Sequence, residues 1–146
     1  MLFTTSFATL VVATLAALAS KGSATPTATS ARMVTDSEFL TWLATTDANI
    51  TYIGPATSKR AKSVMVTYCT KRSGNVCGGS CQVYNGPDTC LDASGTSCLM
   101  ASADVSFCDH GGCSGSCNQL STCGTKLSGG FCDTPGTNSI IVPFVN

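Results

Sequence analysis

Ten cysteines, all between Cys69 and Cys132, constrain this chain of 146 residues more than any other feature. They are Cys69, Cys77, Cys81, Cys90, Cys98, Cys108, Cys113, Cys117, Cys123 and Cys132. An even number of cysteines in an exported chain predicts a disulfide framework, here of five bridges, and the sequence leaves the pairing open. A cut between Cys98 and Cys108 leaves five cysteines on each side. Because five is odd, complete pairing requires at least one disulfide between the two halves.

Zinc binding is the alternative use of these thiols. Two C-x3-C pairs, Cys77/Cys81 and Cys113/Cys117, have the spacing of zinc ligands. An oxidising compartment favours disulfides over free thiolates, and the remaining cysteines also need partners. We therefore expect no metal site, and a member of each pair can bridge either to its neighbour or to a distant cysteine.

The N-terminus predicts export. Residues 7–19 read FATLVVATLAALA, an uncharged apolar run that is shorter than the about 20 residues that a bilayer-spanning helix needs. An A-x-A pattern ends the run at Ala19, and further small residues reach Ala24. This is the layout of a secretory signal peptide, and the alternative is a buried helix of the folded domain. We place the signal peptide at residues 1–19, or up to residue 24 if cleavage occurs later. Because no later segment is long and apolar enough for a membrane span, we expect a secreted, extracellular protein.

The rest of the chain has the size of one domain. Residues 20–34 are rich in Ser, Thr, Ala and Pro, which predicts a flexible leader. A single disulfide-stapled domain is then expected over residues 35–146.

A capping box predicts the first helix. Thr35 and Glu38 are three residues apart, which lets the hydroxyl and the carboxylate cap one another's backbone N–H groups. Phe39 and Trp42 follow at helical spacing, so we expect an amphipathic helix over residues 36–46. Trp42 is the only tryptophan, and we expect it to anchor the core, with stacking on a sugar ring as the alternative.

Alternation of apolar and polar residues predicts four short strands. They are expected at residues 50–52, 64–68, 82–84 and 139–142. Pro143 limits the last one to a strand end or a sheet edge. Residues 104–107 add a shorter extended piece, whereas residues 116–123 have a helical composition. These elements indicate an α+β fold with a roughly four-stranded sheet.

Two processing signals precede the cysteines. Asn49-Ile50-Thr51 is an N-glycosylation sequon, and its place beside a predicted strand leaves the use of Asn49 open. Lys59-Arg60 is a dibasic pair of the kind that secretory proteases cut, which would make residues 25–60 a pro-peptide. We favour an ordinary solvated pair, because the first helix and strand look like parts of the core.

Charge and composition restrict the function. The net charge is zero, and five of the eight basic residues cluster at Lys59, Arg60, Lys62, Lys71 and Arg72. Nucleic-acid binding normally needs a basic face across a domain, so we expect no nucleic-acid partner.

Side chains for catalysis are scarce. His110 is the only histidine, and Asp109 beside it cannot easily orient its ring because neighbouring side chains diverge. Glu38, the only glutamate, caps a helix, and the chain holds no G-x-S-x-G elbow, phosphate loop or dinucleotide fingerprint. We therefore expect no enzyme, no catalytic residue and no cofactor.

Binding needs fewer groups than catalysis. An aromatic face, amides or carboxylates and backbone groups on stapled loops are enough for a sugar. The candidate glycan-binding residues are Tyr84, Asn85, Asp88, Asp109 and His110. For Asn85 and Asp88, ordinary turn chemistry is the alternative.

Two cysteine-spaced segments carry a resemblance to a known group. They read CGGSCQVYNGPDTCLDASGTSCL and VSFCDHGGCSGSCNQLSTCGTKLSGGFCDTPGTNSIIV, and the helical segment EFLTWLATTDANITYIG also fits. Over residues 36–145 the chain resembles the small secreted cysteine-rich proteins of mushroom-forming fungi, of the inkcap glycan-binding type. The resemblance implies an α/β/α sandwich, with helices on both faces of a small antiparallel sheet. It also implies recognition of a fucosylated LacdiNAc-type glycan, and it transfers no particular binding residue.

The sequence therefore favours one of two functions. The first is a secreted lectin-like, carbohydrate-binding protein with a defensive role. The second is a secreted effector or toxin-like protein with a protein target and no catalytic activity. Direct membrane lysis is disfavoured because the sequence offers no long cationic amphipathic helix. The oligomeric state is left open.

Overall fold

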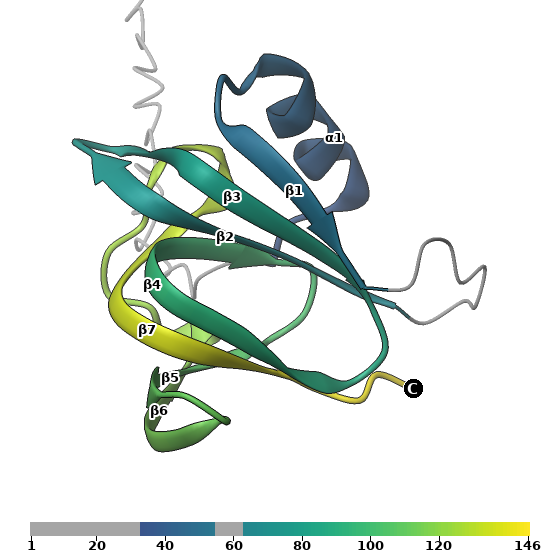
Figure 1. The fold of residues 1–146 in the computed structure, drawn as a ribbon. Helices are drawn as coiled ribbons and strands as arrows, with labels where there is room; N and C mark the ends of the chain where they lie inside the picture. Colours follow the sequence, from purple (N-terminus) through teal and green to yellow (C-terminus); the bar gives the residue numbers. More distant parts are fainter. Residues whose placement is uncertain (1–32, 55–62) are drawn as a thin grey trace, which may run out of the picture.

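A computed structural model describes residues 33–54 and 63–146 (Figure 1). The predicted signal peptide over residues 1–19, most of the predicted leader and the Lys59-Arg60 pair lie outside the described residues. Two residues of the predicted leader are described. Met33 packs against the core, and Val34 is buried, so the packed chain begins slightly before residue 35.

One seven-stranded sheet and one α-helix make up the described domain. The elements are α1 (Asp36–Thr45), β1 (Asn49–Ile53), β2 (Val64–Ser73), β3 (Val76–Gly86), β4 (Thr89–Ala101), β5 (Ser106–His110), β6 (Ser114–Gln119), the short 3-10 helices η1 (Leu120–Thr122) and η2 (Ser128–Gly130), and β7 (Cys132–Val142). The strands lie in the order β1-β3-β2-β4-β7-β5-β6. The expectation of a small disulfide-rich α+β domain is confirmed, whereas the expectation of four strands is wrong.

The helix forms where its capping box predicts it. Thr35 accepts a hydrogen bond from the backbone N–H of Glu38 at 3.3 Å, and the Glu38 carboxylate accepts from the backbone N–H of Thr35 at 2.8 Å. These reciprocal bonds satisfy two of the N–H groups that a helix start leaves without partners. α1 therefore begins at the predicted residue and ends one residue earlier than predicted, at Thr45.

β3 and β4 show why the sequence pattern underestimates the sheet. β3 is longer than the predicted strand at residues 82–84, and the pattern predicts no strand where β4 runs. Their sequences, VCGGSCQVYNG and TCLDASGTSCLMA, place glycine, cysteine and serine where a typical strand alternates apolar and polar residues. Each of the two strands is paired on both sides, and this backbone pairing holds segments of weak strand propensity extended.

The C-terminal elements differ from the sequence prediction in the same way. Residues 116–123, predicted from composition to be helical, form the end of β6 and the 3-10 helix η1. β7 begins at Cys132 rather than at residue 139 and pairs with both β4 and β5. It ends at Val142, which confirms that Pro143 marks a strand end.

β1 is the one strand of the sheet that runs parallel to its neighbour. Asn49 lies opposite Ser80 of β3, and Ile53 lies opposite Tyr84. β2 occupies the other side of β3, and β4 occupies the other side of β2, so the outer side of β3 remains for β1. The expectation of a purely antiparallel sheet is therefore wrong at this pair.

The sheet buries apolar side chains on both faces. The inner face carries the larger core, to which β2, β4 and β7 contribute Val66, Leu99 and Ile140, each 0% exposed. Figure 1 shows β4 and β7 bending strongly, so that the sheet curls around this face. The opposite face, here called the helix face, packs against α1 through Phe39 and against Phe131.

An α/β/α sandwich needs helices on both faces of its sheet. Residues 33–54 and 63–146 contain a single α-helix, which lies beside β1 and covers one face (Figure 1). The sandwich that the resemblance implies is therefore not what these residues form. No helix in the described part of the chain is long and apolar enough to cross a membrane.

All ten cysteines are paired, which confirms the predicted five disulfides. The bridges are Cys69–Cys81, Cys77–Cys98, Cys90–Cys113, Cys108–Cys117 and Cys123–Cys132. Cys90–Cys113 is the bridge between halves that the odd count requires. Every member of a C-x3-C pair bonds to a distant cysteine. Five disulfides fit an oxidising, extracellular compartment.

Candidate functional site

A groove lined mainly by hydroxyl groups lies between β1, β3, β2 and β4. Its volume is about 340 Å³, within the range of about 300–1,000 Å³ that is typical of small-ligand sites. We call the ten lining residues the hydroxyl groove: Thr51, Tyr68, Thr70, Ser80, Cys81, Gln82, Asp92, Ala93, Ser94 and Thr96. Six of the ten carry a hydroxyl group, so the groove offers many groups that both donate and accept hydrogen bonds.

Two irregularities in the strand pairing shape the groove. β4 loses its regular register with β7 between Asp92 and Thr96, where Gly95 has a left-handed φ of 75°. β2 changes its register with β3 at Thr70. Such bulges bend a strand and redirect its side chains, and they are common beside functional sites. Here they bring residues of both strands around one groove.

Tyr68 forms the buried part of the groove. Its hydroxyl donates a hydrogen bond to Oε1 of Gln82 at 2.7 Å and lies 3.1 Å from the backbone carbonyl oxygen of Asp92. Burial, followed by the charge of Asp92, raises the pKa of Tyr68 to about 12, so the phenol stays protonated. Because Gln82 uses its oxygen in this bond, its Nε2 group is the part of the amide left to donate to a ligand.

Asp92 is the only acidic side chain of the hydroxyl groove. Its Oδ1 accepts hydrogen bonds from the Ser94 hydroxyl at 2.8 Å and from the Ser94 backbone N–H at 3.1 Å. These two bonds hold the pKa of Asp92 below its usual range, so the carboxylate is ionised at neutral pH. Its Oδ2 has no hydrogen-bond partner among the described residues and can accept from a ligand.

Hydrogen bonds and a disulfide between neighbouring strands hold the groove in one shape. The Thr70 hydroxyl accepts from the backbone N–H of Ser80 at 3.2 Å, and the Ser97 hydroxyl donates to the Thr70 carbonyl oxygen at 2.9 Å. Cys81, a lining residue, is bonded to Cys69 directly opposite it on β2. Hydrogen bonds and a covalent bridge therefore both fix β2 against β3 at this point.

Tyr84 does not present an open aromatic face. Its side chain is 4% exposed in the inner-face core, and its hydroxyl donates to the carbonyl oxygen of Pro87 at 2.7 Å. A Cβ atom built on Gly86 would lie 2.8 Å from Cζ of the ring, so the backbone covers the ring closely. Burial, followed by the charge of Asp88, raises the pKa of Tyr84.

Asn85 and Asp88 are not brought to the same place as Tyr84. Asn85 lies on the helix face, where it lines a second groove with Asp36 and Leu40 of α1. Asp88 is exposed in the turn between β3 and β4. The segment predicted as one binding turn is thus spread over the core, the helix face and a turn.

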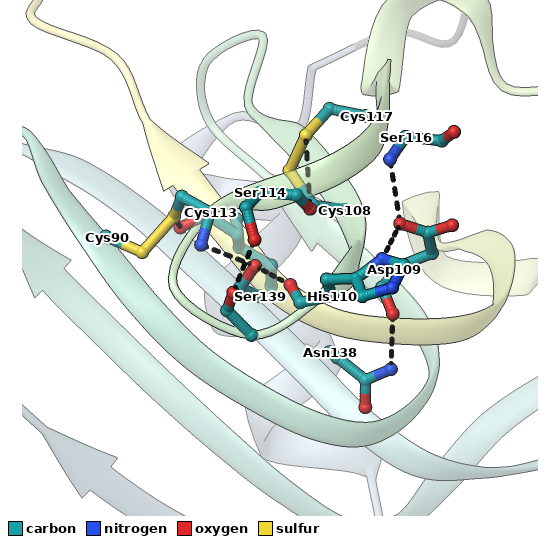
Figure 2. The surroundings of a disulfide bond; sticks show 12 residues. Cys90, Cys108, Asp109, His110, Cys113, Ser114, Ser116, Cys117, Asn138 and Ser139 are labelled. Atoms are coloured by element: carbon teal, nitrogen blue, oxygen red, sulfur yellow. Dashed lines mark hydrogen bonds and ion pairs between the residues drawn. A yellow bond between two sulfur atoms is a disulfide. The ribbon is translucent and has the colours of Figure 1, made fainter.

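Asp109 and His110 contact each other at the end of β5, in the hairpin that β5 forms with β6 (Figure 2). Oδ1 of Asp109 lies 2.7 Å from Nδ1 of His110 and accepts a hydrogen bond from the backbone N–H of Ser116 at 2.8 Å. The expectation that these neighbouring side chains diverge is wrong. The two strands change register between Cys108 and His110, and this bulge turns consecutive side chains to the same side. The bond to His110, followed by the bond to Ser116, lowers the pKa of Asp109.

The backbone of the Asp109–His110 pair is held by hydrogen bonds from β7, whereas its side chains are exposed to solvent. Asn138 donates from Nδ2 to the carbonyl oxygen of Asp109 at 2.7 Å, and the Ser139 hydroxyl donates to that of His110 (Figure 2). The side chains of Asp109 and His110 are 50% and 70% exposed. Within residues 33–54 and 63–146, no hydroxyl or thiol donates to the His110 ring. The pair therefore presents a fixed acceptor and donor to solvent.

Trp42 contacts other aromatic rings at the edge of the helix face. Its ring centroid lies 5.2 Å from that of Phe131 in an edge-to-face arrangement and 6.3 Å from that of Phe39. The ring is half-buried and also lines a shallow groove of about 430 Å³ beside Thr41 and Thr45. It takes part in packing, as expected of a core anchor. No group of three His, Cys, Asp or Glu side chains that could hold a metal ion occurs in the described residues.

Comparison of the chain with protein-family models, with curated proteins and with solved structures finds no match. The resemblance to secreted mushroom proteins stays a prediction.

Sequence reasoning missed the hydroxyl groove. Its members are separated by up to 45 positions, from Thr51 to Thr96, and most are serines and threonines of ordinary surface type. One local signal was present: Asp92-x-Ser94-Gly95 is typical of a turn or bulge in which the aspartate caps the next backbone N–H groups. That signal predicts a kink in a strand, and only the pairing with β2 and β3 turns the kink into one wall of a groove.

Proposed function

We propose that this chain is a secreted, non-catalytic carbohydrate-binding protein and that the hydroxyl groove is its sugar site. The observation that carries the proposal is the gathering of six hydroxyl groups, one amide and one carboxylate around about 340 Å³. A sugar presents several hydroxyl groups on a small frame, and each needs a donor or an acceptor when it leaves water. Amide, carboxylate and hydroxyl side chains supply both roles within one groove.

The charge of the groove favours a neutral saccharide. Asp92 is ionised, and none of the ten lining residues is basic. A sulfated or sialylated sugar would therefore bring a negative charge near a carboxylate without a compensating cation. A neutral ring with free hydroxyl groups gains a charge-assisted hydrogen bond from the same carboxylate. The fucosylated LacdiNAc-type glycan that the resemblance implies belongs to this neutral class.

The rigidity of the groove supports a binding role. Tyr68 and Gln82 are already hydrogen-bonded to each other, and the Cys69–Cys81 bridge closes the strands beneath them. A ligand then finds its partners in place, which lowers the ordering cost of association.

A glycan array tests the proposal. The probe is the oxidised, labelled full chain secreted from a eukaryotic host, with the disulfides confirmed by mass spectrometry. We expect saturable binding to a narrow set of neutral glycans and none to their sialylated or sulfated forms. Asp92→Asn keeps an acceptor for Ser94 but loses the charge, so we expect about a tenfold loss of affinity, equivalent to about 1.4 kcal/mol.

Asp47→Asn is the matched control, because Asp47 is exposed between α1 and β1, outside the hydroxyl groove. Equal losses in the two variants would contradict the assignment of the groove, and so would a preference for anionic glycans. Absence of any binding by the intact protein, tested with Asn49 both modified and unmodified, would favour the alternative, a secreted effector with a protein target. Leu40 and Tyr52, 61% and 68% exposed, are among the exposed apolar side chains that such a partner could contact.

A further inference from the structure

Asn49 stands at the rim of the hydroxyl groove. Alternate residues of a strand share a face, so Asn49 and Thr51 lie on the same face of β1. Thr51 lines the groove, and Asn49 lies directly opposite Ser80, which also lines it. Neighbouring strands are about 4.8 Å apart. The side chain of Asn49 therefore starts within one strand spacing of the groove.

The position of β1 keeps Asn49 accessible. β1 is an edge strand, and in the described part of the chain only β3 pairs with it. Both Asn49 and Thr51 are exposed, so the two defining residues of the sequon face solvent. The third residue of the sequon is thus itself a part of the proposed sugar site.

The first sugars of an N-glycan match the chemistry of the groove. They are neutral N-acetylglucosamine rings, which carry hydroxyl groups and an acetamido group. Oδ2 of Asp92 and the lining hydroxyls can accept from these rings, and Nε2 of Gln82 can donate to them. None of the lining residues is basic. The groove therefore holds no positive charge that a neutral ligand would leave unpaired.

We propose that Asn49 carries an N-glycan whose innermost N-acetylglucosamine residues lie over the hydroxyl groove and occupy it within the same molecule. This inference rests on the proposed function, because it uses the same groove. It means that the occupancy of the sequon sets how much of the protein can bind an external saccharide. The glycosylated form is the closed form, and the unmodified form is the open one.

Three proteins from the same eukaryotic secretory host test this inference. They are the wild-type chain, Asn49→Gln, and Asn49→Gln combined with Pro87→Thr. The Pro87→Thr change creates a new N-x-T sequon that begins at Asn85, which lies on the helix face, away from the groove. Intact mass gives the occupancy of each sequon. Amide NMR shifts of Ser80, Gln82 and Ser94 report on the groove.

We expect the wild-type chain to carry a glycan and to differ from Asn49→Gln at these three amides, whereas a glycan on Asn85 leaves them unchanged. In the array, Asn49→Gln should bind its saccharide about tenfold more tightly than the glycosylated wild type. An unmodified Asn49, or a glycan on Asn49 that leaves the three amides unshifted, would overturn the inference. If no form binds any glycan in the array, the proposed function fails, and the amide shifts still decide this inference separately.

Discussion

β2 and β6 belong to one sheet but are held in it by different forces. All six residues 64–69 of β2 are buried, and all of them except Thr67 contribute side chains to the apolar cores on the two faces. All six residues of β6 are exposed, and among residues 33–54 and 63–146 only β5 pairs with β6, at the edge of the sheet. Two disulfides, Cys108–Cys117 and Cys90–Cys113, tie this hairpin down (Figure 2).

The comparison shows that burial and cross-linking substitute for one another within one sheet. Burying apolar surface stabilises the folded state of the β2 region. The β5–β6 hairpin buries much less, since Phe107 and Cys108 of β5 contact the core whereas all of β6 is exposed. The order of β6 therefore depends mainly on bridges that restrict the unfolded chain. The first two of the following three predictions test this division, and the third tests a side-chain contact within the hairpin.

The largest effect is expected from a cavity in the core. Leu99 is 0% exposed on β4, between β2 and β7. Leu99→Ala should lower the free energy of unfolding by about 2–5 kcal/mol, because it removes buried methyl groups and leaves a cavity. Denaturant unfolding with the disulfides intact measures this. Val76→Ala, at a residue that is 58% exposed, is the control and should change it by less than about 0.5 kcal/mol. Similar losses in the two variants would contradict a core held by burial.

A smaller and more local effect is expected from the hairpin bridge. Cys108→Ser together with Cys117→Ser should cost about 2–4 kcal/mol by freeing the unfolded chain. Native-state hydrogen exchange should show lost protection in β5 and β6 and retained protection in residues 64–69 of β2. The double serine variant of Cys123–Cys132 is the matched control, because both bridges span nine residues. If the hairpin variant exposes β2 as much as β6, the division of forces is wrong.

The smallest effect is expected at the Asp109–His110 pair, which lies next to the turn of the hairpin. The lowered pKa of Asp109 means that the pair stabilises the folded state at pH values above the usual aspartate pKa. This stabilisation is lost as the pH falls through the lowered pKa, below about pH 4. His110→Ala should raise the pKa of Asp109 toward its usual value, as followed by NMR titration of its carboxyl carbon. The pKa of Asp92, which depends on Ser94, should stay unchanged in that variant. An unchanged Asp109 titration would show that Ser116 alone holds its pKa down.

Local patterns determined the parts of this protein that depend on neighbours in the sequence. The capping box of Thr35 and Glu38 specified the start of α1, because its bonds join residues only three apart. The even count of cysteines indicated five disulfides, and its odd division indicated the bridge between halves that Cys90 and Cys113 form. Pro143 marked the end of β7, because proline cannot donate to the ladder.

Tertiary structure decided everything that depends on pairing between distant segments. β4 and β6 are strands because neighbouring strands satisfy their backbone groups, although their side chains lack the strand pattern. The same pairing, interrupted at Thr70 and at Asp92–Thr96, assembles the hydroxyl groove, and a bulge joins Asp109 to His110. The physical reason is that register is a property of two strands together. A single residue inserted in one strand changes which side chains meet, and no local pattern of that strand alone records the result.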